Sequence, residues 1–415
     1  NVTLDTKPAG APTVKNESNV SNNGATSSPK FTWTSGGGGN GIYQVRLNND
    51  VPYQVHPQQP LNSQTTWSLS DSWPDGTVTV RVSEQDIMGR WGNEGSFTIQ
   101  LDRTGPSIKN LMVKRGIGNY QLREGFITNK SLISITFELD NANKDTTCNL
   151  PLNDSTNTCT IERSDALGNK TKITRNIWKR DAVIFINKGG TGDGSSWQEA
   201  SNDLVGVFGD AKSGGKELWV ASGQYGADLY TPSTTTALGG FDAATFPVSS
   251  DSRSYFNTFV EGAQFGVNGG TLDGFVFSGR VNASTGTVNL KNCQIIGAGT
   301  LAATNRGTLN ANNILATGLS GGYGLVYVDG DSYLTIDGGS LIGNIPLDGS
   351  VAFSIGGTAT FKGSLVINGN KTPGSFVQMK VSRVGKLTIE KGVNFDCNQI
   401  FKEDGGSGTC DGKAF

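Results

Sequence analysis

Aromatic and acidic side chains between residues 321 and 333 form the segment of the sequence best suited to binding. It contains Tyr323, Tyr327, Asp329, Asp331 and Tyr333, separated mainly by glycine, leucine and valine. A tyrosine ring stacks on the apolar face of a sugar while its hydroxyl forms hydrogen bonds, and an aspartate accepts hydrogen bonds from sugar hydroxyls. We therefore predict a ligand-binding segment here. The alternative is that Tyr327 alternates into a core and the aspartates only solvate a turn.

A second aromatic segment runs from Tyr225 to Phe259. Its candidate binding residues are Tyr230 and Tyr255, which are accompanied by several phenylalanines. Such an irregular stretch either offers a second binding surface or packs over a neighbouring strand.

Residue types for covalent chemistry are sparse. The single histidine, His56, lies far in sequence from the C-terminal half, which excludes a Ser–His or Cys–His pair there. Glycoside hydrolysis needs two carboxyl groups about 5–10 Å apart, yet no two aspartates are adjacent. Asp273 and Asp337 share a Leu/Ile-Asp-Gly context with two repeats between them. The arginines are dispersed: Arg253, Arg280, Arg306 and Arg383. We predict no catalytic residue, and a carboxylate cluster assembled by folding is the alternative.

Four of the five cysteines form two close pairs. Cys148 and Cys159 flank a turn-rich stretch, and Cys397 and Cys410 bracket the last glycine-rich loop. We predict a disulfide in each pair, which favours an oxidising compartment outside the cytoplasm. Cys293 stands alone beside Ile295 and is interpreted as a buried apolar side chain.

Neither the cysteine spacing nor the carboxylates predict a metal. Zinc motifs are missing, and Asp5, Asp102 and Asp181 supply only one carboxylate at each predicted module junction, where Ca²⁺ needs six or more oxygens. We therefore predict no cofactor, with junctional Ca²⁺ as the alternative.

Charged residues make up 17% and the net charge is −2, so no basic stripe suits a nucleic acid. No apolar run approaches the roughly 20 residues that span a bilayer. The chain begins inside a repeat, so it is interpreted as a fragment of a longer protein.

The elements that position the 321–333 segment belong to a loose repeat in the C-terminal half. Each unit is a short apolar strand closed by glycine or asparagine, and the units begin 18, 19, 25, 27 and 26 residues apart, at 272–279, 290–297, 309–318, 334–344, 361–370 and 387–398. This length is that of one coil of a parallel β-solenoid, whose strands bury their apolar face only by stacking. Glycine and asparagine allow the left-handed corners. Before the solenoid, helical spacing after a cap at Ser195 or Ser196 predicts a helix that covers the first coil: Trp197, Ala200, Leu204, Val207 and Phe208.

Two all-β modules precede this region. Asp86 precedes Asp102 by 16 residues, and Asp165 precedes Asp181 by the same 16. Alternating strands such as 77–82 and 96–101 suit an immunoglobulin-like sandwich. We expect four parts: residues 1–9 as the tail of a preceding repeat, sandwiches at 10–105 and 106–181, and the solenoid at 182–415 with a C-terminal loop closed by a disulfide.

Two resemblances carry these expectations further. Segments 31–41, 73–80 and Asp86-x-x-Gly-x-Trp91 resemble the bacterial Ig-like repeats of large surface proteins, over most of 30–106; in 106–181 only the C-terminal strands and the Asp-Gly turn do so. Asp193-Gly-Ser-Ser-Trp197, the helix and the strand that ends at Tyr225 look like the entry to pectin-lyase-like right-handed parallel β-helices of secreted bacterial proteins, over about 183–398. The first resemblance implies a stalk, and the second implies the handedness of the solenoid.

Together these observations predict an all-β adhesin-like protein at the cell surface or secreted, with the periplasm less favoured. An Ig-like stalk presents a β-helix that binds glycan, or a surface protein of another cell, without catalysis. The alternative is a polysaccharide lyase or glycoside hydrolase, and a structural spacer is a third. No regular Thr-x-Thr ladder recurs, which argues against ice binding. The oligomeric state and ligand identity are not predicted.

Overall fold

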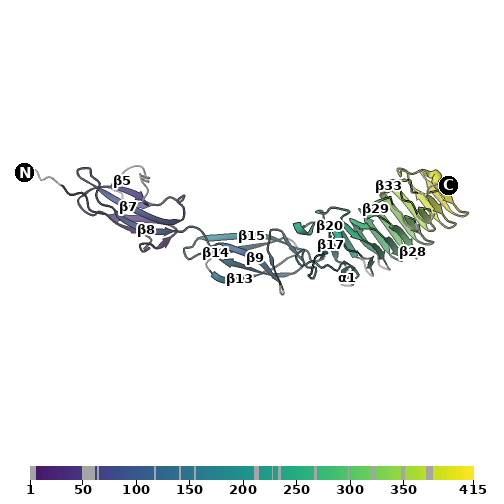
Figure 1. The fold of residues 1–415 in the computed structure, drawn as a ribbon, viewed down its shortest axis with the longest axis horizontal. Coiled ribbons are helices and arrows are strands. Elements are labelled where there is room, and N and C mark those ends of the chain that lie inside the picture. Colours follow the sequence, from purple (N-terminus) through teal and green to yellow (C-terminus); the bar gives the residue numbers. More distant parts are fainter. Residues whose placement is uncertain are drawn as a thin grey trace, which may run out of the picture. The chain divides into compact units, whose positions relative to one another are not determined.

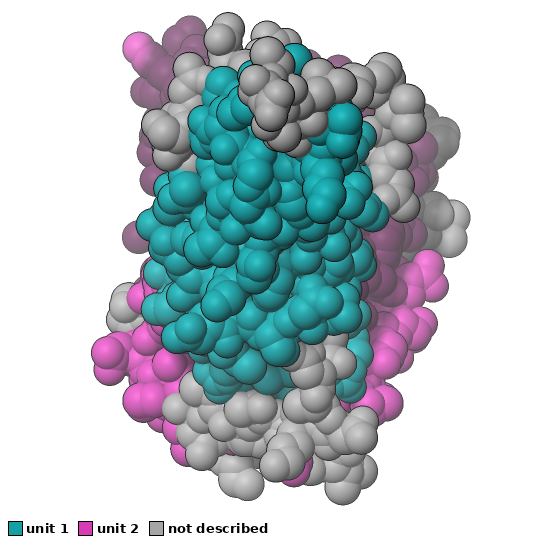
Figure 2. All heavy atoms as spheres, turned by 90° about the vertical axis from the view of Figure 1, so that its left-hand side faces the viewer, with its two compact units in different colours: residues 1–111, 136–147, 160–174 teal, residues 112–135, 148–159, 175–415 magenta. Residues whose placement is uncertain are grey.

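The strands of this all-β chain gather in three successive regions (Figure 1). The computed structural model describes residues 6–48, 61–62, 65–115, 118–139, 142–153, 156–209, 215–226, 228–231, 235–265, 269–297, 299–318, 324–346, 351–370 and 377–415. Asp5, His56 and Tyr323 lie outside these residues, as do the side chains of Cys148 and Tyr230. Contacts divide the chain into two compact units, residues 1–111, 136–147 and 160–174, and residues 112–135, 148–159 and 175–415 (Figure 2). The boundaries expected at 105 and 181 stay predictions.

The first region, here called the first sheet pair, consists of two sheets around one core. One sheet has the order β1 (Thr13–Asn16), β3 (Lys30–Thr34), β6 (Thr66–Ser68), and the other β2 (Ala25–Thr26), β8 (Gly95–Leu101), β7 (Gly76–Asp86), β4 (Gly39–Leu47), β5 (Leu61–Asn62). Most pairings are antiparallel. Alternate side chains point inward, so that Phe31 and Trp33 of one sheet meet Val80 and Ile99 of the other.

The second region, here called the second sheet pair, also contains two sheets. Its sheets have the orders β10 (Gly118–Gln121), β9 (Ile108–Arg115), β12 (Leu132–Leu139), β13 (Ala142–Pro151), and β11 (Phe126–Thr128), β15 (Lys170–Lys179), β14 (Thr156–Ser164). The short strand β11 runs parallel to β15, with Phe126 opposite Ile177. All three of its residues are buried.

The third region, the parallel stack, contains two parallel sheets that the chain visits in turn. Among the described residues, the large sheet has 15 strands. Its main path is β16 (Val183–Ile186), β17 (Glu217–Ala221), β20 (Thr235–Phe241), β23 (Gly270–Asp273), β26 (Thr287–Lys291), β29 (Thr308–Thr317), β31 (Tyr333–Ile342), β33 (Thr358–Asn368), β35 (Lys386–Ile389), β37 (Ser407–Cys410), β38 (Lys413–Ala414), and its side path is β18 (Gly223–Gln224), β21 (Thr258–Val260), β24 (Phe275–Phe277), β27 (Gln294–Ile295). The small sheet is built from the strands between them: β19 (Asp228–Thr231), β22 (Gly262–Phe265), β25 (Arg280–Ser284), β28 (Thr300–Thr304), β30 (Val326–Val328), β32 (Phe353–Ile355), β34 (Met379–Val381), β36 (Ile400–Lys402).

Register in the large sheet places aliphatic side chains directly over one another. Leu272 lies opposite Leu290, then come Ala311, Ile336, Phe361 and Ile389, all buried in one continuous core. Stacking therefore buries rows that no single coil could bury alone. The strands of the repeat units found in the sequence pair in parallel in this sheet, although unit starts such as Leu290 and Leu309 lie two residues out of register.

The corners of the coils also stack. Asn292, Asn313, Gly338 and Gly363 occupy the same corner of successive coils, with φ of 48°, 53°, 74° and 68°. The Asn313 amide donates to the Asn292 side-chain oxygen at 2.8 Å. These left-handed corners use asparagine and glycine as expected, but they lie inside the predicted repeat units, which were expected to have such corners at their ends.

At the N-terminal end of the stack, the predicted helix over 197–208 is too long. Helix α1 spans Leu204–Gly209, and its first turn is capped by Asp203, whose Oδ1 accepts from the Gly206 N–H at 2.7 Å. Ser195 and Ser196 do not cap it, because their hydroxyls bond to Glu199 instead. Helical spacing continues through an irregular turn, so the apolar pattern alone overstated the length.

An aromatic cluster covers the first strands together with this short helix. The rings of Phe185, Trp197, Trp219 and Phe241 pack against one another, with ring centres 4.8–5.7 Å apart in the pairs that contact. Ile127 of β11 belongs to the same cluster. The second sheet pair thus supplies part of the cover that the sequence assigned to the helix.

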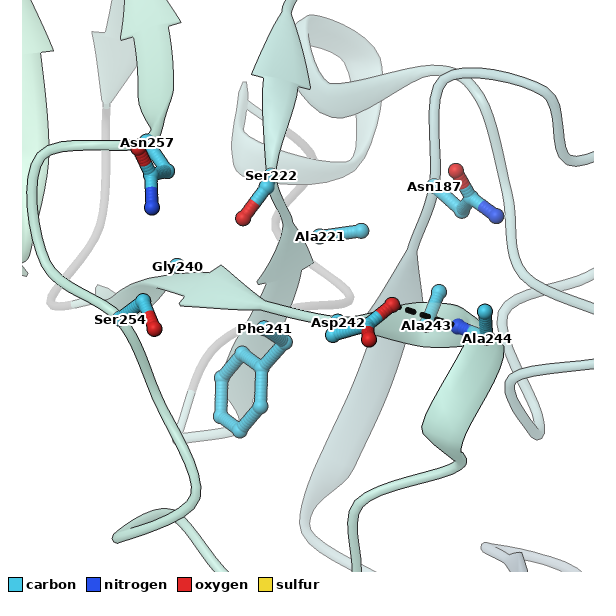
Figure 3. Close-up of a pocket in the computed structure, with 10 residues that line it drawn as sticks. All are labelled: Asn187, Ala221, Ser222, Gly240, Phe241, Asp242, Ala243, Ala244, Ser254 and Asn257. Carbon is cyan, nitrogen blue, oxygen red and sulfur yellow. Dashed lines mark hydrogen bonds between the residues drawn. The ribbon is translucent and has the colours of Figure 1, made fainter.

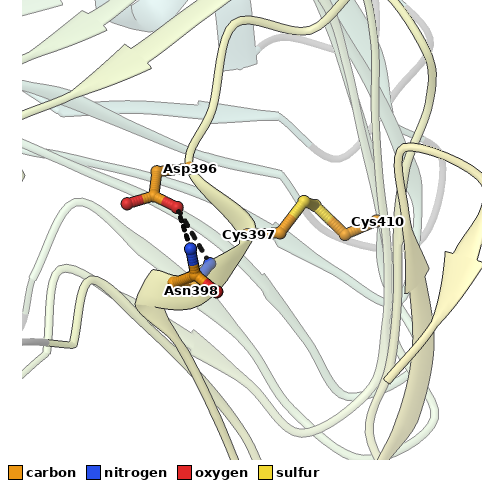
Figure 4. The surroundings of a disulfide bond; sticks show 4 residues. All are labelled: Asp396, Cys397, Asn398 and Cys410. Atoms are coloured by element: carbon orange, nitrogen blue, oxygen red, sulfur yellow. Dashed lines mark hydrogen bonds between the residues drawn. A yellow bond between two sulfur atoms is a disulfide. The ribbon is translucent and has the colours of Figure 1, made fainter.

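The C-terminal end is closed by a hairpin and a disulfide. Strand β38 pairs antiparallel with β37, and Cys397 is bonded to Cys410 (Figure 4). Cys397 opens the 3₁₀ turn η3 (Cys397–Gln399), whose first residues are held by the Asp396 carboxylate, which accepts from the backbone and side-chain amides of Asn398. This disulfide is as predicted. Cys159 is buried, but its predicted bond to Cys148 involves a side chain outside the described residues and stays a prediction.

Candidate functional site

The predicted segment 321–333 ends in a corner between the two sheets of the stack. Tyr327 is the middle residue of β30, between buried Val326 and Val328, and it is 38% exposed. Strand alternation therefore turns Tyr327 outward, away from the core. Tyr333, the first residue of β31, is 53% exposed. Both tyrosine rings are available to solvent on either side of the corner.

Asp329 fixes the corner that separates the two tyrosines. Its Oδ1 accepts from the Ser332 hydroxyl at 2.6 Å, and its Oδ2 accepts from the backbone N–H of Asn305, one coil earlier, at 3.1 Å. The Ser332 oxygen in turn accepts from the Arg306 N–H at 3.1 Å. The carboxylate is thus held in one orientation by two successive coils.

A hollow of about 520 Å³ lies at this corner. Six residues from three successive coils line it: Thr285, Asn305, Arg306, Asp329, Gly330 and Asp331. The Arg306 Nε lies 3.7 Å from an Asp331 oxygen, but both side chains are about four-fifths exposed. An ion pair so exposed contributes little to stability, so both groups remain available to a ligand.

The backbone around the hollow is strained. Thr285, Asn305 and Arg306 have φ of 68°, 53° and 68°, in the left-handed region. For a residue other than glycine this conformation costs roughly 1–2 kcal/mol, and it is least expected for a β-branched residue such as Thr285. Strain of this kind concentrates at ligand-binding sites, where the side chain is retained despite its cost.

Register connects this corner to other aromatic residues of the small sheet. In the backbone register of the small sheet, Tyr327 lies opposite the buried Ala302 on one side and Ser354 on the other, and the row continues through Lys380 to Phe401. Phe401 is 50% exposed and lies three strands from Tyr327, about 14 Å at the usual strand spacing. Sequence reasoning missed Phe401, because only the pairing of β34 with β36 places it in this row.

The second predicted segment packs onto the stack through Arg253. Its guanidinium lies 3.1 Å from the Asp273 carboxylate, with both side chains largely buried, and 5.1 Å from the ring centre of Tyr255. Tyr255 remains 43% exposed. Asp273 also accepts from the Asn292 amide at 3.0 Å. Asp273 therefore fastens this segment to the coils.

Asp273 and Asp337 do not form a carboxylate pair. Lys291 and Asn312 separate them in one outward row, so their backbones are about 14 Å apart. This exceeds the range that glycoside hydrolysis requires. Asp337 instead lies 3.6 Å from Lys362 on the next coil.

A second hollow, of about 420 Å³, lies beside the 3₁₀ turn η2 (Ala243–Thr245). Ser222, Asp242 and Asn257 present polar atoms around it (Figure 3). The Asp242 carboxylate accepts from the Ala244 N–H at 3.1 Å and thereby caps the turn. No sequence motif indicated this hollow, because its residues come from four separate segments.

The remaining candidates have structural partners. Asp102 accepts from the Thr104 N–H at 3.2 Å, and Asp181 accepts from Lys179 at 2.9 Å. No group of three or more His, Cys, Asp or Glu side chains suited to a metal occurs within the described part of the chain. Burial raises the pKa of the Cys293 thiol to about 12, so that thiol is inert at neutral pH. Across the described ranges, no helix is long and apolar enough to cross a membrane.

Comparison with known proteins finds similarity among solved structures. No protein-family model and no curated protein matches the chain. Among solved structures, the chain is similar to the fibronectin(III)-like modules of Clostridium thermocellum CbhA, with 10% identity over 40% of this chain and 94% of that chain and a TM-score of 0.19.

Proposed function

We propose that this chain is an extracellular or cell-surface recognition protein that binds glycan without catalysis. Ig-like sandwiches at 10–105 and 106–181 form a stalk, and residues 182–415 form a right-handed parallel β-helix that carries the binding site. The observation that supports this most directly is the corner hollow, which Asp329 and Asp331 line in the segment between the exposed Tyr327 and Tyr333.

The architecture supports the β-helix. The chain alternates between two parallel sheets, its corners recur at one position, and its core is continuous from coil to coil. The disulfide between Cys397 and Cys410 is compatible with an oxidising compartment.

The side chains at the corner match the chemistry of a sugar. The exposed rings offer apolar plates for the C–H faces of pyranose rings. Asp329 and Asp331 accept hydrogen bonds from hydroxyls, and the Arg306 guanidinium donates up to five. Because the hollow is shallow and open, each contact is weak, and repeated display of the protein raises the overall avidity.

A glycan array probed with the whole chain tests this proposal. We expect binding to a restricted set of glycans, reduced several-fold by Tyr327→Ala or Tyr333→Ala, because each change removes an exposed aromatic ring that can stack on a sugar. Tyr255→Ala is the matched control, because this tyrosine is similarly exposed but lies in the other segment.

Two outcomes contradict the proposal. Binding lost with Tyr255→Ala alone places the site elsewhere, and no binding to any glycan removes the function. Release of reducing ends or unsaturated products from a bound polysaccharide makes the chain an enzyme.

A further inference from the structure

Two turns in different sheet pairs have the same hydrogen-bond geometry. They are residues 86–90, after β7, and residues 165–169, after β14, here called the aspartate turns. Asp86 Oδ1 accepts from the N–H groups of Met88 and Arg90 at 2.8 and 2.9 Å, and Asp165 Oδ1 accepts from those of Leu167 and Asn169 at the same two distances.

The match extends to the residue four positions after each aspartate and to the glycine that precedes that residue. Arg90 Nε donates to Asp86 Oδ2 at 2.7 Å, and Asn169 Nδ2 donates to Asp165 Oδ2 at 2.8 Å. The glycines, Gly89 and Gly168, have φ of 84° and 85°. Each aspartate therefore holds the side chain four residues later in one direction.

That side chain reaches the segment that enters its own sheet pair. Arg90 Nη2 donates to the carbonyl of Lys7 at 3.4 Å, and Asn169 Nδ2 donates to the carbonyl of Asp102 at 3.0 Å. A glycine allows close backbone packing nearby in both cases. A methyl group on Gly92 would overlap Ala9, and one on Gly105 would overlap Lys170.

The segment 102–106 is also bound by the sheet pair that precedes it. Asp75 accepts from the Arg103 N–H at 2.9 Å and from the Thr104 hydroxyl at 2.5 Å. The Arg103 guanidinium donates to the carbonyls of Ser27, Ser70, Asp71 and Trp73 at 3.0–3.2 Å. A simple tether would have its backbone solvated, but this one is hydrogen-bonded from both directions.

We propose that the aspartate turns are linker-binding surfaces: each binds the segment that enters its sheet pair, and Asp165 and Asn169 together with Asp75 lock residues 102–106 in place. The partner of this surface is a peptide of this chain. The lock converts a connection that glycine and proline would leave loose into a fixed joint.

Limited digestion of the whole chain with trypsin tests the lock, because Arg103 is itself a cleavage site. We expect Asn169→Ala and Asp75→Ala each to raise the rate of cleavage after Arg103 at least about fivefold, the factor for the loss of one typical hydrogen bond. Hydrogen exchange of the Arg103 and Thr104 amides rises in parallel.

Matched controls separate loosening from unfolding. Arg90→Ala breaks the equivalent contact at Lys7 and leaves Arg103 protected, and Asp71→Ala removes only an exposed charge 3.7 Å from Arg103. Cleavage after Arg81, inside β7, reports unfolding of the first sheet pair. The proposal is overturned if Arg103 stays protected in Asn169→Ala and Asp75→Ala, or if cleavage after Arg81 rises equally.

Discussion

The Thr128 hydroxyl donates to the backbone carbonyl of Ser195 at 3.0 Å, with both side chains buried. The N–H of Asn129 donates to the same carbonyl at 2.9 Å. Thr128 ends β11 of the second sheet pair, whereas Ser195 lies in the covered end of the parallel stack. Since Ile127 also belongs to the aromatic cluster around Trp197 and Trp219, the two regions share a core there.

The shared core predicts cooperative unfolding. Ile127→Ala leaves a cavity among the aromatic rings, and such truncations cost about 2–5 kcal/mol. We expect the unfolding midpoint of the stack, followed by the fluorescence of Trp197 and Trp219, to fall by the same amount as that of the second sheet pair. Val80→Ala, an equally buried control in the first sheet pair, should leave this transition unchanged. If Ile127→Ala lowers the unfolding midpoint of the second sheet pair but leaves the tryptophan transition of the stack unchanged, the two regions do not share a core.

Relief of strain at Arg306 should separate stability from binding. Arg306→Gly removes a left-handed penalty of about 1–2 kcal/mol and adds about 0.4–1 kcal/mol of unfolded-state entropy. We expect the free energy of unfolding to be unchanged or raised by up to about 1.5 kcal/mol, while glycan binding is lost. Asn313→Gly, at another left-handed corner, should retain binding, and should be less stable than Arg306→Gly because it also loses the hydrogen bond to Asn292. Equal binding by both variants would mean that Arg306 does not contact the ligand.

Removal of the Cys397–Cys410 disulfide should loosen the last coil. The two residues are 13 apart in sequence, and closure of such a loop stabilises by about 3 kcal/mol on chain-entropy arguments. The paired change to serine should lower the denaturant midpoint and raise hydrogen exchange in residues 397–415. The control is Cys293→Ala, which removes a cysteine outside the disulfide. Serine is not used there because it would place a hydroxyl group in the buried core. Unchanged exchange in the last coil would mean that the hairpin alone holds it.

The first aspartate turn predicts a loss of stability in acid. Hydrogen bonds from the Arg90 backbone, and then from its side chain, lower the pKa of Asp86 despite burial. Because the folded pKa lies below the unfolded value near 3.9, the contribution is full above that pH and disappears as the pH falls through the folded pKa. The urea midpoint of the first sheet pair should fall below about pH 4 in the parent, and Asp86→Asn should lower the midpoint at pH 7 and flatten this dependence. Asp71→Asn, fully exposed, should change neither.

The stacked parallel strands were predictable because their apolar pattern recurs, but their exact register was not. Leu290 and Leu309 both begin sequence units, yet Leu290 lies opposite Ala311. A slip of two residues keeps every side chain on the same face, so the hydrophobic pattern cannot distinguish the two alignments. The spacing between repeat units also varies from 18 to 27 residues, so a fixed repeat length cannot be used to predict the register.

The candidate site was predictable in part. Tyrosine and aspartate spacing located Tyr327, Asp329 and Tyr333, but the hollow beside them depends on Thr285 and Arg306 from earlier coils. Their strain is invisible in sequence, because neither is a residue type expected at a left-handed φ. The role of β11 at the end of the stack was missed for a different reason: Phe126–Thr128 is a three-residue strand whose partners lie about 50–70 positions away.

The recurring corner at Asn292, Asn313, Gly338 and Gly363 means that this part of the protein is built from equivalent structural units. Because every turn of the chain returns to the same vertex, a complete turn is the natural unit of duplication or loss, and the aliphatic rows would close again over the gap. Variation in length is then confined to the excursions between vertices, where new recognition loops can evolve without disturbing the interior.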